Sequence, residues 1–415
     1  MRIPVAIATR LPIRQSRLLL ILTAVAFVPR LIVGLHRGPD WINTGYTLNI
    51  DIAQNWWRGH GLCAAEGAVE CAVRLPVYPL LIAPFVNTGS EYPLLLILQA
   101  LIGAGLAPLT FALAMELFNG RVALLAAVAA ALDPYAVIHS TALQDTVVVD
   151  SLAVLAVLLT LVAYRRADLR LVVAAGVAAS LLILTSARIA PFVMLTIGWT
   201  MVYPATTRVR TVLVMLLPVA LLVGPWLVRN YYVVGGPVLT TETGLSLWKG
   251  HNEIAMTVYP ERTLDEIDDL LWARLTPEQR KRVEEAPTEL TADRELGRIG
   301  LAYIRTRPLE SLRNAVLRVW HGFVGGLMPY RSWPIQLGYA VIFTPVTVLA
   351  LLGLWRAGTT APHILMRLAF ASLIFTSAVF WTYTSHRSYL HAFEFIYAAS
   401  VLELWSRRFR RVPAS

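Results

Sequence analysis

The sequence predicts an all-α polytopic membrane protein, a bundle of about ten transmembrane helices. Of its 415 residues, 57% are hydrophobic and only 15% are charged, a composition that excludes an ordinary soluble protein of this size. Apolar runs of span length also recur along the chain, and about 20 residues cross about 30 Å of hydrocarbon as an α-helix. Both observations indicate repeated passage through a membrane.

The predicted spans follow one another with arginine in alternate connections. The formal net charge of +10 does not indicate nucleic acid as a partner, because the cations form short clusters between spans rather than one continuous basic face. Under the positive-inside rule, the arginine-bearing connections and both termini are cytoplasmic. The predicted spans are 17–37, 93–117, 121–140, 147–164, 169–187, 189–204, 210–228, 335–355, 362–382 and 389–406.

The connections without arginine clusters are then extracytoplasmic. Two of them are long, and they divide the chain into three predicted parts. Residues 1–228 form a transmembrane module with a first outer loop at 38–92. Residues 229–334 form an extracytoplasmic subdomain that is partly helical, because 14 of the 26 acidic residues lie within 241–310 among helix-like patterns. Residues 335–415 supply the last spans and a basic cytoplasmic tail.

The first outer loop contains the only two cysteines, Cys63 and Cys71. A disulfide between them would stabilise so short a loop by about 2–3 kcal/mol in the chain-entropy model. No histidine or second cysteine pair stands at zinc-like spacing, so the sequence predicts no metal site there.

The same loop offers two carboxylates and one arginine as candidate functional groups. Apolar and aromatic residues between 46 and 57 fit an interfacial helix, which carries Asp51, while Asp40 lies beside the end of the first span. Solvated acids next to an aromatic belt are the alternative reading. In "RLPVYPLL", residues 74–81, Arg74 precedes a proline-rich bend and Tyr78; it either extends to headgroups or holds a phosphate.

Two shorter outer connections carry one charged candidate each. Asp145 opens the span that follows "HSTALQ", where it is either a helix cap or a functional acid. Arg188 lies at the turn "TSARIAP", and a charge at the membrane interface is a functional candidate by default.

Two polar groups lie further along the chain, at 244–255 and 385–395. Such mixed sets would suit a sugar and a phosphate, although His391 and Glu394, three residues apart on one helix face, also fit a structural hydrogen bond. The candidates here are His251, Asn252, Glu253, Arg387, His391 and Glu394.

Taken in order, these segments resemble the GT-C superfamily of membrane glycosyltransferases. The resemblance rests on "AQNWWRGHG", "RLPVYPLL", "HSTALQDT", "LTSARIAP", "PWLVRNYY" and "SLWKGHNEIA". It is strongest to bacterial proteins similar to protein O-mannosyltransferases, the dolichyl-phosphate-mannose type, and to aminoarabinose transferases. It covers residues 17–260 and weakens beyond them, and a further, weaker similarity lies at 385–397.

The resemblance implies an enzyme of the bacterial inner (plasma) membrane that uses a polyprenyl-phosphate-linked sugar, with its active site on the extracytoplasmic side. The donor would carry a hexose or pentose, and the acceptor would be a hydroxyl of a glycan, lipid or protein. Arg74 matches a family position near the donor phosphate, and Arg188 matches the arginine of the family's "TRP" turn; we assign both, with Arg387, to binding of the donor phosphate. Tyr78, His251, Asn252, Glu253, His391 and Glu394 are assigned to substrate binding.

The chain departs from the family pattern at the expected base. Family members carry an aspartate eight residues before the position of Ala53, and here that position is Gly45. Asp40 or Asp51 would take the role instead, and we favour Asp40 because it lies nearer the end of the first span; Asp145 is a third acidic member of the catalytic group. The resemblance leaves open both a metal-free site and a divalent cation held by Asp40 and Asp145.

The implied reaction needs a carboxylate that accepts the acceptor's proton and cations that stabilise the leaving phosphate. A single displacement of this kind inverts the anomeric centre, by analogy with glycosidases. Two alternatives remain: a non-catalytic GT-C-like binding or scaffold protein, and a transporter of lipid-linked sugars. Charges deep within spans would favour the transporter, and apart from Arg30 the charges lie near span ends.

Overall fold

A computed structural model describes residues 13–38, 47–64, 70–87, 91–264, 266–323, 326–381 and 383–410. Within these ranges the chain is helical and contains no strand, which confirms the all-α prediction. Asp40 and Gly45 lie outside the described residues.

Helices occupy all ten segments predicted as spans. Six stretches are long and apolar enough to cross a membrane: 16–37, 92–117, 146–166, 208–234, 333–356 and 361–379. They correspond to α1 (Ile13–Arg37), α4 (Glu91–Ala104) with α5 (Leu106–Leu117), α8 (Thr146–Arg166), α11 (Arg208–Val234), α18 (Trp333–Arg356) and α19 (Ala361–Val379). Shorter or more polar helices fill the other positions: α6 (Gly120–Leu132), α9 (Leu169–Thr185), α10 (Ala190–Val202) and α21 (His391–Arg410).

Two predicted spans are interrupted for local reasons. The segment 93–117 is divided at Gly105 into α4 and α5. The segment 121–140 ends early at Leu132, because Asp133 caps a separate short helix, α7 (Pro134–His139), through its carboxylate. Oδ1 of Asp133 accepts hydrogen bonds from the amides of Tyr135 at 2.9 Å and Ala136 at 3.3 Å.

The helices of the bundle pack closely through small residues. The α6 face toward its neighbours is formed by alanines that are fully buried, namely Ala123, Ala126, Ala127, Ala130 and Ala131. At the contact of α18 with α21, a Cβ added to Gly353 would lie 2.4 Å from the carbonyl oxygen of Tyr397. Small side chains of this kind let membrane helices approach one another.

Arg30 lies inside the bundle rather than facing lipid. Its guanidinium donates to Ser140 at 3.1 Å and to the backbone carbonyls of Ala26 and Ala131 at 2.7 and 3.0 Å. Arg30, the one charge that the sequence analysis placed well inside a predicted span, therefore has protein partners. These hydrogen bonds join α1 to α6 and to the end of α7.

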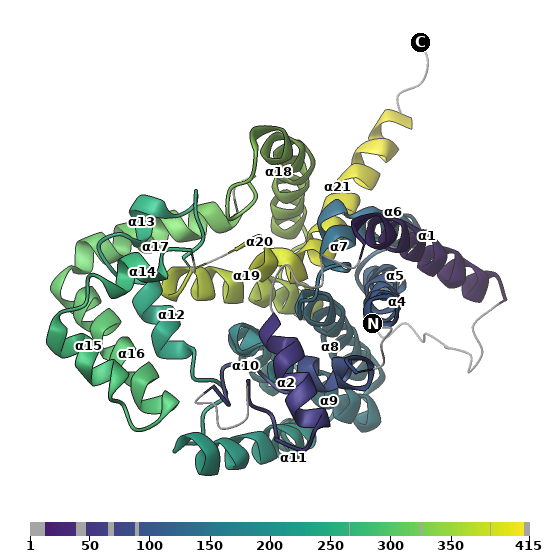
Figure 1. The fold of residues 1–415 in the computed structure, drawn as a ribbon. Helices are drawn as coiled ribbons and strands as arrows, with labels where there is room; N and C mark the ends of the chain where they lie inside the picture. The colour runs from purple at the N-terminus through teal and green to yellow at the C-terminus, as the bar shows by residue number, and fades with distance from the viewer. Residues whose placement is uncertain are drawn as a thin grey trace.

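Shorter helices gather beside the bundle. In Figure 1 the α12 to α16 group lies on the left, and α1 and α4 to α6 lie on the right. The short helices in the first part of the chain are α2 (Thr47–Trp57) and α3 (Val77–Ile82). Those between α11 and α18 are α12 (Thr243–Gly250), α13 (Ala255–Val258), α14 (Asp268–Trp272), α15 (Pro277–Glu284), α16 (Glu289–Thr306) and α17 (Pro308–Phe323), and α20 (Thr384–Arg387) precedes α21.

Candidate functional site

A cavity of about 260 Å³ lies where the predicted outer loops meet. Its wall comes from six separate stretches of the chain: α2, the segment before α3, the start of α8, the turn between α9 and α10, α12, and the segment from α19 to α20. The charged and polar residues used below are Arg74, Asp145, Arg188, Glu242, Lys249 and His386, which all line it.

Arg74 is held in the cavity wall by the chain that precedes α12. The amide of Thr241 donates to the carbonyl of Ala72 at 3.1 Å, and the hydroxyl of Thr240 donates to the carbonyl of Val73 at 3.1 Å. Nη1 of Arg74 lies 3.1 Å from Oε2 of Glu242. Residues 72–74 and 240–242 are thus joined by two hydrogen bonds to backbone carbonyls and by one ion pair.

Asp145 and Arg188 form a second ion pair in the cavity wall. Asp145 precedes α8 but makes no capping hydrogen bond through its side chain, so its carboxylate is not used by the helix end. Arg188 lies in the single 3₁₀ turn Ala187–Ile189, and its Nη2 is 3.8 Å from Oδ1 of Asp145. Nε and Nη2 of Arg188 are buried and make no hydrogen bond within the described residues.

Three of these cavity residues, Glu242, Lys249 and His386, were not assigned to the site from the sequence. Lys249, in the last turn of α12, is buried, and its Nζ lies 2.7 Å from Oδ1 of Asp268. His386, in α20, is half-buried, and its Nδ1 lies 3.4 Å from the carbonyl oxygen of Trp381. Lys249 and His386 belong to the two polar groups that the sequence indicated at 244–255 and 385–395, but the sequence analysis gave neither side chain a role in the site.

The cations outnumber the carboxylates in the cavity wall. Arg74, Arg188 and Lys249 line it together with the two acids Asp145 and Glu242. Asp268, outside the wall, pairs with Lys249, and the Arg188–Asp145 pair is the longest of the three ion pairs at 3.8 Å. Because low-dielectric walls strengthen charge interactions, Arg188 is the cation of this wall best placed to attract an anionic group.

His386 is neutral in this setting. Burial, with the nearby Arg188 cation, lowers the pKa of His386 to about 3. The unfolded chain would titrate near pH 6.5, so between about pH 6.5 and pH 3 the unfolded state binds the additional proton and stability falls as the pH falls.

We therefore expect the Tm of the purified protein to decrease between pH 7.5 and pH 5, and to decrease less steeply in His386→Gln. Thermal unfolding followed by intrinsic fluorescence at several pH values measures both slopes. Equal slopes in the two proteins would contradict the assignment of a low pKa to this imidazole.

Several residues expected at the site lie elsewhere. Arg387, His391 and Glu394 are almost fully buried outside the cavity wall. Nη2 of Arg387 lies 3.0 Å from Glu394, and Nδ1 of His391 lies 2.9 Å from Oδ2 of Asp133. Their assignments to phosphate and sugar are therefore withdrawn, because these side chains are occupied with partners inside the bundle.

The segment after α12 also turns away from the cavity. Burial, with the Arg318 cation, lowers the pKa of His251 to about 4, and Nε2 of His251 lies 2.8 Å from the carbonyl of Val379. Asn252 accepts from the amides of Ile254 and Ala255 and so starts α13. Glu253 pairs with Arg274 and Arg307. We withdraw the substrate-binding assignments of His251, Asn252 and Glu253.

In the first outer loop, Tyr78 lines the cavity and Asp51 does not. The Tyr78 hydroxyl donates to Oε1 of Gln99. Asp51 lies on α2 with its side chain exposed, and loss of part of its hydration by neighbouring protein atoms raises the pKa of its carboxyl. From that helix it is Asn49, not Asp51, that lines the cavity. Asp40 lies outside the described residues.

The described residues offer no ready metal centre. Within them, no group of three or more His, Cys, Asp and Glu side chains is arranged to hold a metal ion. The two carboxylates of the cavity, Asp145 and Glu242, each face an arginine.

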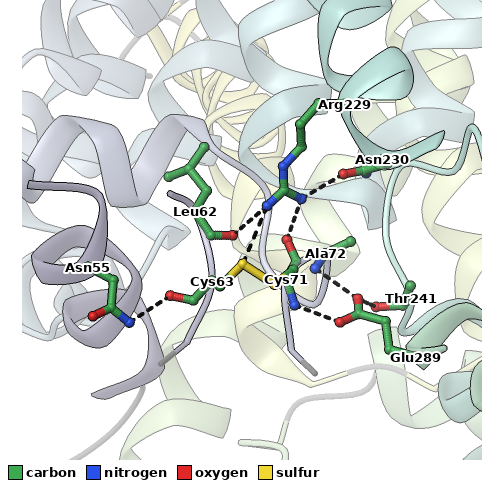
Figure 2. The surroundings of a disulfide bond; sticks show 9 residues. All are labelled: Asn55, Leu62, Cys63, Cys71, Ala72, Arg229, Asn230, Thr241 and Glu289. Atoms are coloured by element: carbon green, nitrogen blue, oxygen red, sulfur yellow. Dashed lines mark hydrogen bonds between the residues drawn. A yellow bond between two sulfur atoms is a disulfide. The ribbon is translucent and has the colours of Figure 1, made fainter. Parts of the chain in front are cut away.

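A disulfide anchors the loop that leads to Arg74. The structure joins Cys63 to Cys71, as the sequence predicts, and Figure 2 shows the groups around this bond. The Glu289 carboxylate accepts from the amides of Cys71 at 2.6 Å and Ala72 at 2.8 Å. Arg229 donates to the carbonyls of Cys71 at 2.6 Å and Leu62 at 2.9 Å, so both sides of the loop are held to other parts of the chain.

Removing this disulfide is expected to loosen the approach to Arg74. In a Cys63→Ser, Cys71→Ser variant the loop loses a constraint of about 2–3 kcal/mol in the chain-entropy model. We expect faster hydrogen exchange at the amides of residues 71 and 72, whereas exchange in the distant α18 stays unchanged. Unchanged exchange at 71 and 72 would show that Glu289 and Arg229 hold the loop without the disulfide.

No protein-family model matches the sequence, and no curated protein matches it either. Among solved structures, the chain is similar to the archaeal oligosaccharyltransferase AglB from Archaeoglobus fulgidus in complex with an inhibitory peptide and a dolichol-phosphate. That match has 15% identity and a TM-score of 0.55, and it covers 97% of this chain and 52% of AglB. The same enzyme tethered to an acceptor peptide gives 14% identity and a TM-score of 0.54, covering 96% of this chain and 50% of that one.

A further match is ArnT from Cupriavidus metallidurans bound to undecaprenyl phosphate, with 14% identity, a TM-score of 0.40, and coverage of 93% of this chain and 78% of ArnT. The chain spans about half the length of the AglB structures it matches. The likeness to AglB shows that the chain shares the fold of that structure.

Proposed function

We propose that this protein is an integral-membrane glycosyltransferase that moves a hexose or pentose from a polyprenyl-phosphate donor to an acceptor hydroxyl. The observation that carries the proposal is the cavity in which Arg74, Arg188 and Asp145 are brought together from three separate loops. The fold, shared with an oligosaccharyltransferase solved with a dolichol-phosphate, supports it.

In this proposal Arg74 and Arg188 bind the donor phosphate, and Lys249 adds a third positive charge. A guanidinium presents a planar set of donors that matches phosphate oxygens and keeps its charge at any physiological pH. Nε and Nη2 of Arg188 make no hydrogen bond among the described residues, so they are available for phosphate oxygens. As the sugar–phosphate bond breaks, these cations stabilise the charge that grows on the leaving phosphate.

The carboxylates of the cavity take a complementary role. Glu242 and Asp145 neutralise Arg74 and Arg188, and a phosphate that binds these arginines would compete with both carboxylates. Asp145, released from part of its interaction with Arg188, then accepts the proton of the acceptor hydroxyl as that oxygen attacks the anomeric carbon. The carbon–oxygen bond to the phosphate breaks, and the configuration inverts.

Asp145 is the base in this account, in place of Asp40, which the sequence favours, and of Asp51, which lies outside the cavity. Asp40 stays a second candidate from the sequence. If a divalent cation takes part, Asp145 is the described oxygen ligand that would hold it beside the phosphate.

Apolar side chains at the cavity wall suit the first isoprene units of such a donor. Leu75, Leu245, Phe380 and Trp381 line the cavity together with the polar groups. The acceptor, a glycan, lipid or protein hydroxyl, would approach from the side of the cavity that faces water.

We place the cavity on the extracytoplasmic side of a bacterial inner membrane, with both termini in the cytoplasm. Arginine in the alternate connections supports this orientation. The Cys63–Cys71 disulfide, close to the cavity, supports an oxidising compartment on that side.

The proposal is tested by incubating the purified protein in lipid vesicles with radiolabelled polyprenyl-phosphate-linked mannose, arabinose or glucose and an envelope extract as acceptor. We expect transfer of label from one of these donors, with inversion of the anomeric configuration in the product. Binding of the donors without transfer would support a non-catalytic binding protein. Movement of intact donor across the membrane would instead support a transporter.

A further inference from the structure

Helix α17 is amphipathic in the reverse sense to a helix that faces water. Its exposed face carries Leu309, Leu312, Val316 and Trp320, whose exposed fractions are 82%, 63%, 61% and 60%. These residues are spaced by three or four positions, which places them on one side of the helix. We call them the outer stripe of α17.

The opposite side of α17 faces the protein and is polar. Ser311, Asn314 and Arg318 are 6%, 6% and 1% exposed. The guanidinium of Arg318 donates to the carbonyls of Gly250 at 2.6 Å and Ala378 at 2.7 Å. Arg318 therefore holds the buried face to the protein by hydrogen bonds, and the apolar residues of the outer stripe are exposed.

Helix α15 of the same group of outer helices shows the usual arrangement. In α15 the buried position is Val283, and the exposed positions are mainly charged, including Glu278, Arg280, Lys281 and Glu284. The composition of α15 suits contact with water, whereas a contiguous apolar stripe with polar residues behind it indicates an apolar environment.

The position of α17 identifies that environment. Through Arg318 the helix contacts the end of α19, one of the helices that can cross a membrane. The chain then enters α18, a second such helix, whose first turn exposes Trp333 and Ile335 at 70% and 55%. In Figure 1, α17 leads from the α12–α16 group toward α18, so the helix that carries the outer stripe lies against one candidate membrane span and leads into another.

We propose that the outer stripe of α17 contacts the hydrocarbon of the lipid bilayer at the membrane boundary. With 16 residues, α17 is not among the helices long and apolar enough to span; it attaches to the membrane through one face. Polar residues that turn inward and apolar residues that turn outward are the pattern of lipid-contacting helices. The exposed Arg313 on this helix can extend to lipid phosphates. The predicted extracytoplasmic subdomain then ends before Pro308.

This proposal does not depend on the glycosyltransferase activity, and it is tested by spin labelling. Because the chain has two cysteines and both form the disulfide, a single added cysteine is the only free thiol. Val316→Cys and Leu312→Cys place a nitroxide on the outer stripe of the full-length protein in vesicles of phosphatidylethanolamine and phosphatidylglycerol. Glu284→Cys on α15 is the matched control.

We expect the labels at 316 and 312 to collide several-fold more with oxygen, which concentrates in hydrocarbon, than with a water-soluble nickel chelate, and the label at 284 to show the reverse preference. Access of the chelate at 316 and 312 equal to that at 284 would overturn the proposal, because the stripe would face water. Low access to both reagents at 316 and 312 would also overturn it, because a second copy or another protein would cover the stripe.

Discussion

Replacing Asp145 by asparagine is expected to lower kcat for sugar transfer by about 10²- to 10⁴-fold, the usual contribution of a general base. Asparagine keeps the size of the side chain and removes its ability to accept the proton of the acceptor hydroxyl. The effect should fall on kcat more than on the KM of the donor, since in the proposed account the phosphate is bound by arginines. Steady-state transfer of radiolabelled sugar measures both constants.

Asp269→Asn is the matched control for this change, because Asp269 is exposed on α14 and does not line the cavity. It should leave kcat unchanged. If Asp145→Asn keeps its activity while Asp40→Asn loses it, the base is Asp40 and the role given to Asp145 is wrong.

Replacing Arg188 by glutamine is expected to lower kcat/KM for the donor by about 10²- to 10³-fold, as the loss of one donor to a developing anion does in other active sites. Glutamine removes the charge and the planar set of donors. Arg188→Lys should recover part of the loss, because lysine restores the charge without the two-pronged geometry. The measurement is the transfer rate at several donor concentrations, with donor binding measured separately.

Arg262→Gln serves as the control, since Arg262 is an exposed arginine that pairs with Glu266. It should behave as the wild type does. An Arg188→Gln variant with normal donor binding and normal kcat/KM would remove this guanidinium from the phosphate site.

The positions of the helices followed from the sequence because apolar runs of span length have few other structures available in a membrane. The ends were harder to predict. The break at Gly105 and the early end of α6 depend on single residues, the glycine and the cap Asp133, whose local effects a hydropathy pattern averages out.

Arg74, Arg188 and Asp145 could be predicted because each is a charged residue at a turn between apolar segments, where few structural roles compete. Which side chains of "WKGHNE" and "SHRSYLHAFE" line the cavity could not be predicted from the sequence. There, Lys249 and His386 line the cavity, and their near neighbours His251 and Arg387 turn inward. That difference depends on where α12 ends and where α20 begins, and a shift of one or two residues reverses the direction of a side chain.

The outer stripe of α17 was missed for a different reason. Hydropathy averaged over the segment is low, because α17 also contains glutamate and arginine. Only the structure shows that the polar side chains Ser311, Asn314 and Arg318 face inward and that the apolar ones are left outside.

The most direct test of the central claim is an electron cryomicroscopy map of the protein in lipid nanodiscs with an added polyprenyl phosphate. We predict density for the phosphate between the guanidinium groups of Arg74 and Arg188, with the isoprenoid leaving the cavity past Phe380 and Trp381. Phosphate density at another place on the protein, with the cavity between these two arginines filled only by water, would contradict the claim.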